Sequence, residues 1–316
     1  MSKELEETQE VDIDDGVEAE DDSLIDFYSG DALSVEESRS ISMSSRVQLI
    51  LLAGAVDCGK SSLIASLFHC FQNGPLGGYL FAGSRTLVGF ERRCHKARVA
   101  SNRDTPTMDR TSFGEKRKLL HLKVAQKSNP STPKHLFFAD VSGESFEDAI
   151  NSVDDCAQVP LLRRSDHFVL LVDGSKMIDL AFRQNAKKEA LLLLQSCIES
   201  NRLGERSLVD VIFSKYDLFV HDDTALNFIE SIKSAIKGRF GDLLGRIRFS
   251  NIAAIPETGT KAIKLGYGLN EIFPSWVEDN PGSYFPIELY NENLEGCCEF
   301  DYFGRNYARR ESGINE

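Results

Sequence analysis

The chain has 316 residues, 41% of them apolar, which is enough to bury a substantial core, and its formal net charge is −13. Residues 1–40 carry 15 acidic and two basic side chains, so residues 41–316 hold the remaining 34 of each sign and are neutral overall. Nucleic acids and anionic membrane surfaces bind proteins through a basic face, so we expect neither as a partner.

The seven cysteines are an odd number and are dispersed along the chain without a repeating framework. This pattern is typical of a reducing compartment. The first residues are acidic, unlike a secretory leader, and no run approaches the roughly 18 apolar residues of a membrane span. We therefore expect a cytoplasmic protein without an integral membrane segment.

Both ends of the chain differ in composition from the middle. Residues 1–44 combine high negative charge with few large apolar residues and are expected to form an acidic disordered tail. Residues 281–316 form a second tail that is rich in aromatic side chains. A plain surface role and the binding of a protein partner are open for both tails, and the cluster Leu24–Tyr28 offers a partner an apolar contact. Residues 45–280 remain as one domain.

Between the tails, short apolar runs alternate with segments of helical periodicity. The first run, residues 47–54, is apolar and ends in glycine, which indicates a buried strand. Further strands are predicted at 119–125, 135–140, 167–173, 208–214 and 246–255, and helices at 62–71, 179–200, 225–239 and 269–278. This alternation predicts an α/β fold, a doubly wound, mostly parallel sheet with helices on both faces. Ligands of such sheets bind at the carboxyl ends of the strands.

One connection is too long for a plain loop. Residues 75–112 lie between the first predicted helix and the second predicted strand. Long connections in compact domains usually contain structure of their own. We therefore treat residues 75–112 as an insertion and expect a helix at about residues 87–101.

The loop after the first strand carries the strongest motif. The residues from Gly54 to Ser61 match the pattern G-x-x-x-x-G-K-S, directly after a strand and directly before a helix. Its glycines let the backbone approach phosphate groups, so that the amides of residues 57–62 face the negative charge. Lys60 is expected to reach the β- and γ-phosphates and Ser61 to bind Mg²⁺. The predicted cofactor residues of this loop are Gly54, Asp57, Cys58, Gly59, Lys60, Ser61 and Ser62.

A second motif follows the strand at residues 135–140. Asp140 ends this strand, where a carboxylate can hold the shell of a magnesium ion. Gly143 can present its backbone amide to a γ-phosphate and pivot when that phosphate leaves, which is the transition of a molecular switch. Asp140 is therefore a candidate metal ligand and Gly143 a candidate catalytic residue.

A third motif, Ser214-Lys215-Tyr216-Asp217, closes the strand at residues 208–214. Asp217 can accept two hydrogen bonds from guanine, through N1–H and the exocyclic amine, and adenine lacks this pair of donors. A buried acceptor without a partner costs about 1–3 kcal/mol, so the wrong base is penalised. The stem of Lys215 can lie over the base. The motif favours GTP and GDP as cofactors, with Ser214, Lys215 and Asp217 as binding residues.

The order and spacing of these three motifs resemble the Ras-like P-loop GTPases of the TRAFAC class over roughly residues 46–280. Further stretches are similar to the prokaryotic double-GTPase group, which genomic context implicates in bacterial conflict and signalling systems. These stretches are Phe81 to His95, Arg110 to Ser112, Ser142 to Phe146 and Leu162 to Gly174. The resemblance implies a GTP-binding switch protein with a magnesium-dependent hydrolase activity and an unidentified effector protein.

Two residues depart from the Ras-like pattern in a way that predicts slow hydrolysis. Glu144 stands where these proteins usually have the glutamine that orients the attacking water, and a carboxylate cannot donate a hydrogen bond to the transition state. Val56 stands where glycine is frequent, and its bulk opposes the insertion of an arginine finger. Ser214 replaces the usual asparagine and weakens one brace between the base and the phosphate loop. Lys60, Gly143 and Glu144 are the candidate catalytic residues.

The threonine that closes over Mg²⁺ in a switch has two candidates. Thr111 precedes the second predicted strand and matches the narrower group, whereas Thr107 follows proline, as in small GTPases. We favour Thr111, which completes the predicted metal ligands with Ser61 and Asp140.

Two other functions compete with a GTPase switch. A nucleotide-dependent scaffold would bind GTP or GDP without useful turnover and recruit partners through its tails, and Glu144 and Val56 keep this reading open. A P-loop kinase would use the same phosphate loop with another acceptor, but it explains neither the Ser214–Asp217 motif nor Gly143.

Overall fold

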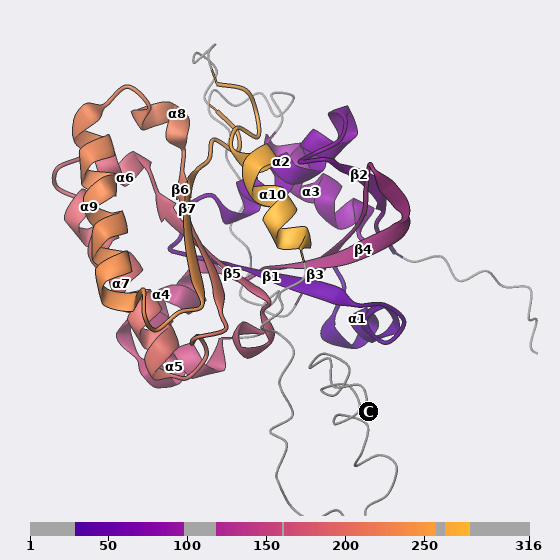
Figure 1. Cartoon of the computed structure of the whole chain (residues 1–316), viewed down its shortest axis with the longest axis horizontal. Coiled ribbons are helices and arrows are strands. Elements are labelled where there is room, and N and C mark those ends of the chain that lie inside the picture. Colours follow the sequence, from indigo (N-terminus) through magenta and orange to yellow (C-terminus); the bar gives the residue numbers. More distant parts are fainter. Residues whose placement is uncertain (1–28, 98–117, 160, 257–262, 279–316) are drawn as a thin grey trace, which may run out of the picture.

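The computed structural model describes residues 29–97, 118–159, 161–256 and 263–278. Within them, seven strands form one sheet in the order β2-β3-β4-β1-β5-β6-β7 (Figure 1). The strands are β1 (Val47–Ala53), β2 (Tyr79–Gly83), β3 (Leu119–Gln126), β4 (Asn129–Asp140), β5 (His167–Asp173), β6 (Leu208–Ser214) and β7 (Arg246–Asn251). The α-helices are α1 (Val35–Ser42), α2 (Lys60–Asn73), α3 (Leu87–Ala97), α4 (Gly143–Asn151), α5 (Val153–Gln158), α6 (Ser175–Ile178), α7 (Arg183–Glu199), α8 (Tyr216–Phe219), α9 (Asp223–Phe240) and α10 (Leu269–Val277).

The predicted α/β fold is confirmed. β4, β1, β5, β6 and β7 run parallel, whereas β2 and β3 pair antiparallel at one edge of the sheet. Helices α4, α5, α7 and α9 cover one face and α2, α3 and α10 cover the other (Figure 1). The carboxyl ends of the parallel strands therefore meet at one edge, between the two helical layers.

The central strands alternate between two hydrophobic cores. Leu49 and Leu51 of β1 contribute to the core under α7 and α9, and Ile50 and Leu52 to the core under α2 and α10. All seven residues of β1 are buried. A strand that is buried on both faces reads as a continuous apolar run, which is why its position was predictable from the sequence.

The predicted bounds hold for β5 and β6 but not for β4. Residues 129–134 add to β4 beyond the predicted strand, and they include Pro130 and Pro133. β1 pairs with β4 only from His135 onward, and of the added residues Asn129 and Lys134 pair with β3. Proline is tolerated where one side of a strand has no partner in the sheet. The predicted strand began only at His135, after both prolines.

The expected disordered tail of residues 1–44 needs a correction, because the structure gives residues 29–44 a defined course. Leu33 exchanges two backbone hydrogen bonds with Leu119 at the start of β3, of 2.9 and 2.8 Å. Helix α1 follows, with a capping box formed by Ser34 and Glu37, and Ile41 is buried. Residues 1–28 lie outside the described residues, as do residues 281–316.

The insertion of residues 75–112 contributes an edge strand and a helix. Strand β2 was not predicted, and α3 begins at Leu87 as predicted. Phe90 of α3 is buried and stacks on Phe68 of α2, with the ring centroids 5.1 Å apart. Residues 98–117 lie outside the described residues. Among those that the structure describes, no helix is both long and apolar enough to cross a membrane.

Candidate functional site

The loop of residues 54–59 joins the carboxyl end of β1 to the first turn of α2. Gly54 has a φ of 141°, and a Cβ at this position would lie 2.5 Å from the carbonyl oxygen of Leu171 and 2.8 Å from Cys58 Sγ. Asp57 also adopts a positive φ, of 61°. The loop therefore passes closely over the end of β5, along a course that only glycine can take at Gly54.

Lys60 directs its charge across this loop. Its side chain is buried, and Nζ donates to the carbonyl oxygens of Gly54 at 2.9 Å and Ala55 at 2.8 Å. Nζ also lies 3.8 Å from Cys58 Sγ, and burial raises the pKa of that thiol. The ammonium group is thus held inside the loop by these two carbonyl oxygens.

Two of the three predicted metal ligands lie within the described residues. Ser61 is half-buried in the first turn of α2, and Asp140, the last residue of β4, lies in register with Leu52 of β1. Thr111 and its alternative Thr107 lie outside the described residues. Hydroxyl and carboxylate oxygens are donors that Mg²⁺ prefers. The chemistry of these two residue types is therefore compatible with Mg²⁺.

A cavity of about 130 Å³ lies between the phosphate loop and the carboxyl ends of β6 and β7. Asp217 and Ser214 are both buried, and the cavity brings together two parts of the chain that are far apart in sequence. Its lining includes Gly59, Ser62, Ser214, Lys215, Asp217 and Ala254. Two predicted cofactor residues of the first motif, Gly59 and Ser62, therefore face the same cavity as all three of the third motif.

Lys215 and Ser214 are braced by β5. Lys215 has a φ of 54°, and its Nζ lies 2.9 Å from Oδ2 of the buried Asp173 and 3.4 Å from the hydroxyl of Ser175. Ser214 Oγ donates to the carbonyl oxygen of Val172 at 3.3 Å. The side chain of Ser214 thus bonds to β5, while the Lys215–Asp173 ion pair joins the ends of β5 and β6.

Helix α4 begins directly against the phosphate loop. A Cβ at Gly143 would lie 2.6 Å from the backbone nitrogen of Val56, so the backbones of the two residues are in close contact. Glu144 is exposed at the first turn of α4. One turn later, Glu147 Oε1 accepts a hydrogen bond from Val56 N at 3.3 Å. Gly143 and Glu147 therefore both contact the phosphate loop, at Val56.

Sequence reasoning missed Glu147 and the role of Asp173. Glu147 lies four residues after Gly143, which places both on one face of a helix, but α4 itself was not predicted. Asp173 ends a predicted strand next to the strand that carries Lys215, and a carboxylate at such a position is a signal for a partner of that lysine. The packing of neighbouring strands decided both contacts.

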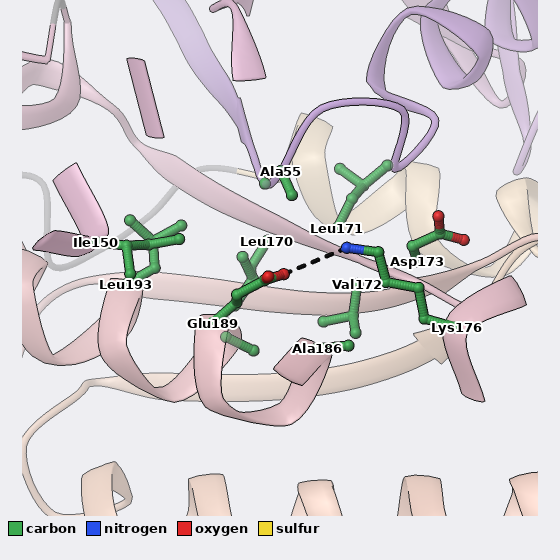
Figure 2. Close-up of a pocket in the computed structure, with 12 residues that line it drawn as sticks. Ala55, Ile150, Leu170, Leu171, Val172, Asp173, Lys176, Ala186, Glu189 and Leu193 are labelled. Carbon is green, nitrogen blue, oxygen red and sulfur yellow. Dashed lines mark hydrogen bonds and ion pairs between the residues drawn. The ribbon is translucent and has the colours of Figure 1, made fainter. Parts of the chain in front are cut away.

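A second, much smaller cavity of about 20 Å³ lies on the other side of the phosphate loop (Figure 2). Ala55 and Ile150 face it from the loop and from α4, and Leu170 and Leu193 face it from β5 and α7. Lys176 Nζ and Glu189 Oε2 form an ion pair of 3.4 Å beside it. The space is about that of one water molecule, so the loop, α4 and α7 pack closely here.

The family model described as Double-GTPase 2 matches residues 48–277 of the chain. This stretch contains the phosphate loop, Gly143 and the Ser214–Asp217 motif. No curated protein matches the chain in sequence.

Solved structures similar to this chain include three nucleotide-binding proteins. The translation elongation factor SelB from Methanococcus maripaludis, in complex with the GTP analogue GppNHp, has 12% identity over 74% of this chain and 34% of its own, with a TM-score of 0.39. A putative nucleolar GTP-binding protein 1 from Plasmodium falciparum has 15% identity over 72% and 83%, with a TM-score of 0.37. Sup35 complexed with GDP has 12% identity over 73% and 45%, with a TM-score of 0.34. The chain spans about a third of the length of the SelB chain.

Proposed function

Because the chain belongs to the Double-GTPase 2 family, we propose that it is a GTP-binding switch protein with slow, magnesium-dependent hydrolysis of GTP to GDP and phosphate. The observation that carries this proposal is the cavity of about 130 Å³, which both Gly59 and Asp217 line. A nucleotide with its base in this cavity has its phosphates directed toward the loop of residues 54–59.

The residues of the cavity favour guanine. Asp217 is buried and offers two carboxylate oxygens to the paired N–H groups of guanine. Adenine leaves this carboxylate without matching donors, at a cost of about 1–3 kcal/mol. The Lys215–Asp173 ion pair keeps the Lys215 stem in place beside the base site. Specificity for GTP over ATP follows from Asp217.

The phosphate side supplies positive charge and hydrogen-bond donors. Lys60 and the first amides of α2 stabilise the phosphates, because backbone N–H groups and the helix dipole favour negative charge there. Ser61 and Asp140 are the residues of the described chain that would hold Mg²⁺, which would neutralise the charge that develops on the transferred phosphate. Gly143 is the first residue of α4, so a γ-phosphate that contacts Gly143 acts directly on the position of this helix.

Glu144 supports slow turnover. Its carboxylate can accept a hydrogen bond from the attacking water, but it cannot donate one to the transition state, and its negative charge opposes that of the γ-phosphate. We propose that the long-lived GTP state serves a bacterial signalling or conflict system, as the family resemblance implies. An effector would bind the surface around α4.

Nucleotide titration of the full chain tests the base preference. We expect fluorescent GDP and GTP to bind at least about tenfold more tightly than ATP in the presence of Mg²⁺, because one unmatched buried acceptor has this effect. Asp217→Ala should remove most of the difference by weakening GTP binding. Equal affinity of the wild-type protein for ATP and GTP would contradict the guanine assignment.

Single-turnover hydrolysis separates a slow enzyme from a scaffold. We expect slow release of phosphate by the wild-type protein and a rate about tenfold higher for Glu144→Gln, because the amide adds one donor to the transition state. If neither protein releases phosphate from bound GTP, the chain is a nucleotide-dependent scaffold.

A further inference from the structure

One face of α4 lies along the beginning of the phosphate loop over about two turns. Gly143, Glu147 and Ile150 are spaced four and three residues apart and so share this face. Gly143 contacts the backbone of Val56, Glu147 accepts from its N–H at 3.3 Å, and Ile150 faces the same small cavity as Ala55 (Figure 2). Helix α4 is therefore positioned directly by the loop that is expected to hold the phosphates.

The three contacts differ in chemistry. Gly143 and Ile150 contribute close packing, which is insensitive to charge. Glu147 contributes a carboxylate, and this carboxylate occupies a backbone N–H of the phosphate loop. A γ-phosphate that reaches Gly143 must approach the same short stretch of backbone, because Gly143 and Val56 are in contact. The carboxylate and the phosphate carry the same sign of charge, so they cannot share this space without repulsion.

We propose that Glu147 sets the preference of this site between GDP and GTP. With GDP, the hydrogen bond between Glu147 and Val56 stays formed and α4 remains on the loop. With GTP, the γ-phosphate repels the carboxylate and the hydrogen bond is lost, so α4 is released at its second turn. Glu147 is a positioning residue that converts the additional phosphate charge into a displacement of α4. This inference rests on the proposed binding of guanine nucleotides.

The variant Glu147→Gln tests the inference. Glutamine keeps the length of the side chain and an oxygen that can accept from Val56 N–H, but it removes the charge. Asp148→Asn is the matched control, because Asp148 is also exposed on α4 and is the next residue in the chain. The measurement is the ratio of the dissociation constants of fluorescent GDP and of a non-hydrolysable GTP analogue, on the full chain with Mg²⁺.

We expect Glu147→Gln to improve the binding of the GTP analogue relative to GDP by about tenfold, and Asp148→Asn to leave the ratio within about twofold of the wild type. An unchanged ratio in Glu147→Gln overturns the inference, as do equal changes in both variants, which indicate a general effect of net charge. In both cases intact GDP binding leaves the proposed function standing. Binding of neither nucleotide by the wild-type protein overturns both proposals.

Discussion

His167, the first residue of β5, shows how strongly burial can shift the pKa of a single residue. Its side chain is fully buried, and neither ring nitrogen forms a hydrogen bond with the residues that the structure describes. Burial lowers its pKa to about 4, an effect that the charge of Asp210 opposes and that the charges of Arg248 and Arg246 reinforce. The imidazole is therefore neutral in the folded protein over a range in which an unfolded chain takes up a proton.

This difference predicts a pH dependence of stability. The pKa of His167 is about 4 in the folded protein and about 6.5 when unfolded, so the unfolded state binds more protons between these values. The contribution of His167 to the free energy of unfolding is fully present above about pH 6.5. It falls by on the order of 1–3 kcal/mol as the pH drops toward 4. Chemical unfolding at pH 7.5 and pH 5 should show a smaller loss in His167→Leu than in the wild type. An equal loss in both proteins would contradict the lowered pKa.

Helix α1 and the residues before it are ordered, although the acidic composition of residues 1–44 predicts disorder. Asp31 pairs with Arg92 of α3, and the carbonyl oxygen of Gly30 accepts from the N–H of Gly89 at 3.0 Å. These contacts join the segment to α3, and the Leu33–Leu119 pair joins it to β3, although its neighbours in sequence are strongly acidic. The average composition of residues 1–44 predicted disorder, whereas a few apolar and capping residues decided the structure of residues 29–44.

Ile41 tests whether α1 is part of the folded domain. Only 2% of its surface is exposed, and it belongs to the core that β1 and β5 share. Ile41→Ala should lower the free energy of unfolding by about 2–4 kcal/mol, because it deletes buried apolar volume. Met43, two residues later, is 86% exposed, so Met43→Ala should change the free energy of unfolding by less than about 0.5 kcal/mol. Equal effects of the two variants in denaturant unfolding would show that α1 does not stabilise the domain.

At the scale of the whole molecule, a buried polar cluster joins α10 to the sheet. Asp210 of β6 is 1% exposed and accepts from Arg248 Nε at 2.6 Å and from Arg248 Nη2 at 2.9 Å. It also accepts from Trp276 Nε1 of α10 at 2.9 Å. Three elements that are far apart in sequence therefore meet at one carboxylate, and this contact holds α10 over its face of the sheet.

Asp210→Asn should be strongly destabilising. The substitution removes the charge that Arg248 requires and leaves a partly buried guanidinium without its partner, which costs about 3–5 kcal/mol in comparable buried pairs. Asp242 is exposed, and Asp242→Asn controls for the loss of one negative charge. Thermal unfolding should show a clearly lower midpoint for the first variant alone. Equal midpoints would mean that the cluster contributes nothing to stability.

Much of the fold was predictable because buried parallel strands are local patterns. β5 and β6 were predicted with their observed bounds, and the phosphate loop was recognised from eight consecutive residues. Helices α4 and α5 and strand β2 were missed, because they are short and part of their stability comes from packing against other elements. In the site, two separate motifs predicted five residues that line the large cavity, whereas Glu147 was not predicted. These five are Gly59, Ser62, Ser214, Lys215 and Asp217.

The sequence by itself determined the α/β fold class, the phosphate loop and the residue types that favour guanine. These features depend on neighbouring residues, whose periodicity and turn chemistry can be read along the chain. Only the tertiary structure decided that α4 lies on Val56, that Lys215 pairs with Asp173 and that Trp276 reaches Asp210. Such contacts depend on which strands become neighbours in the sheet, and that choice is made by the packing of the whole domain.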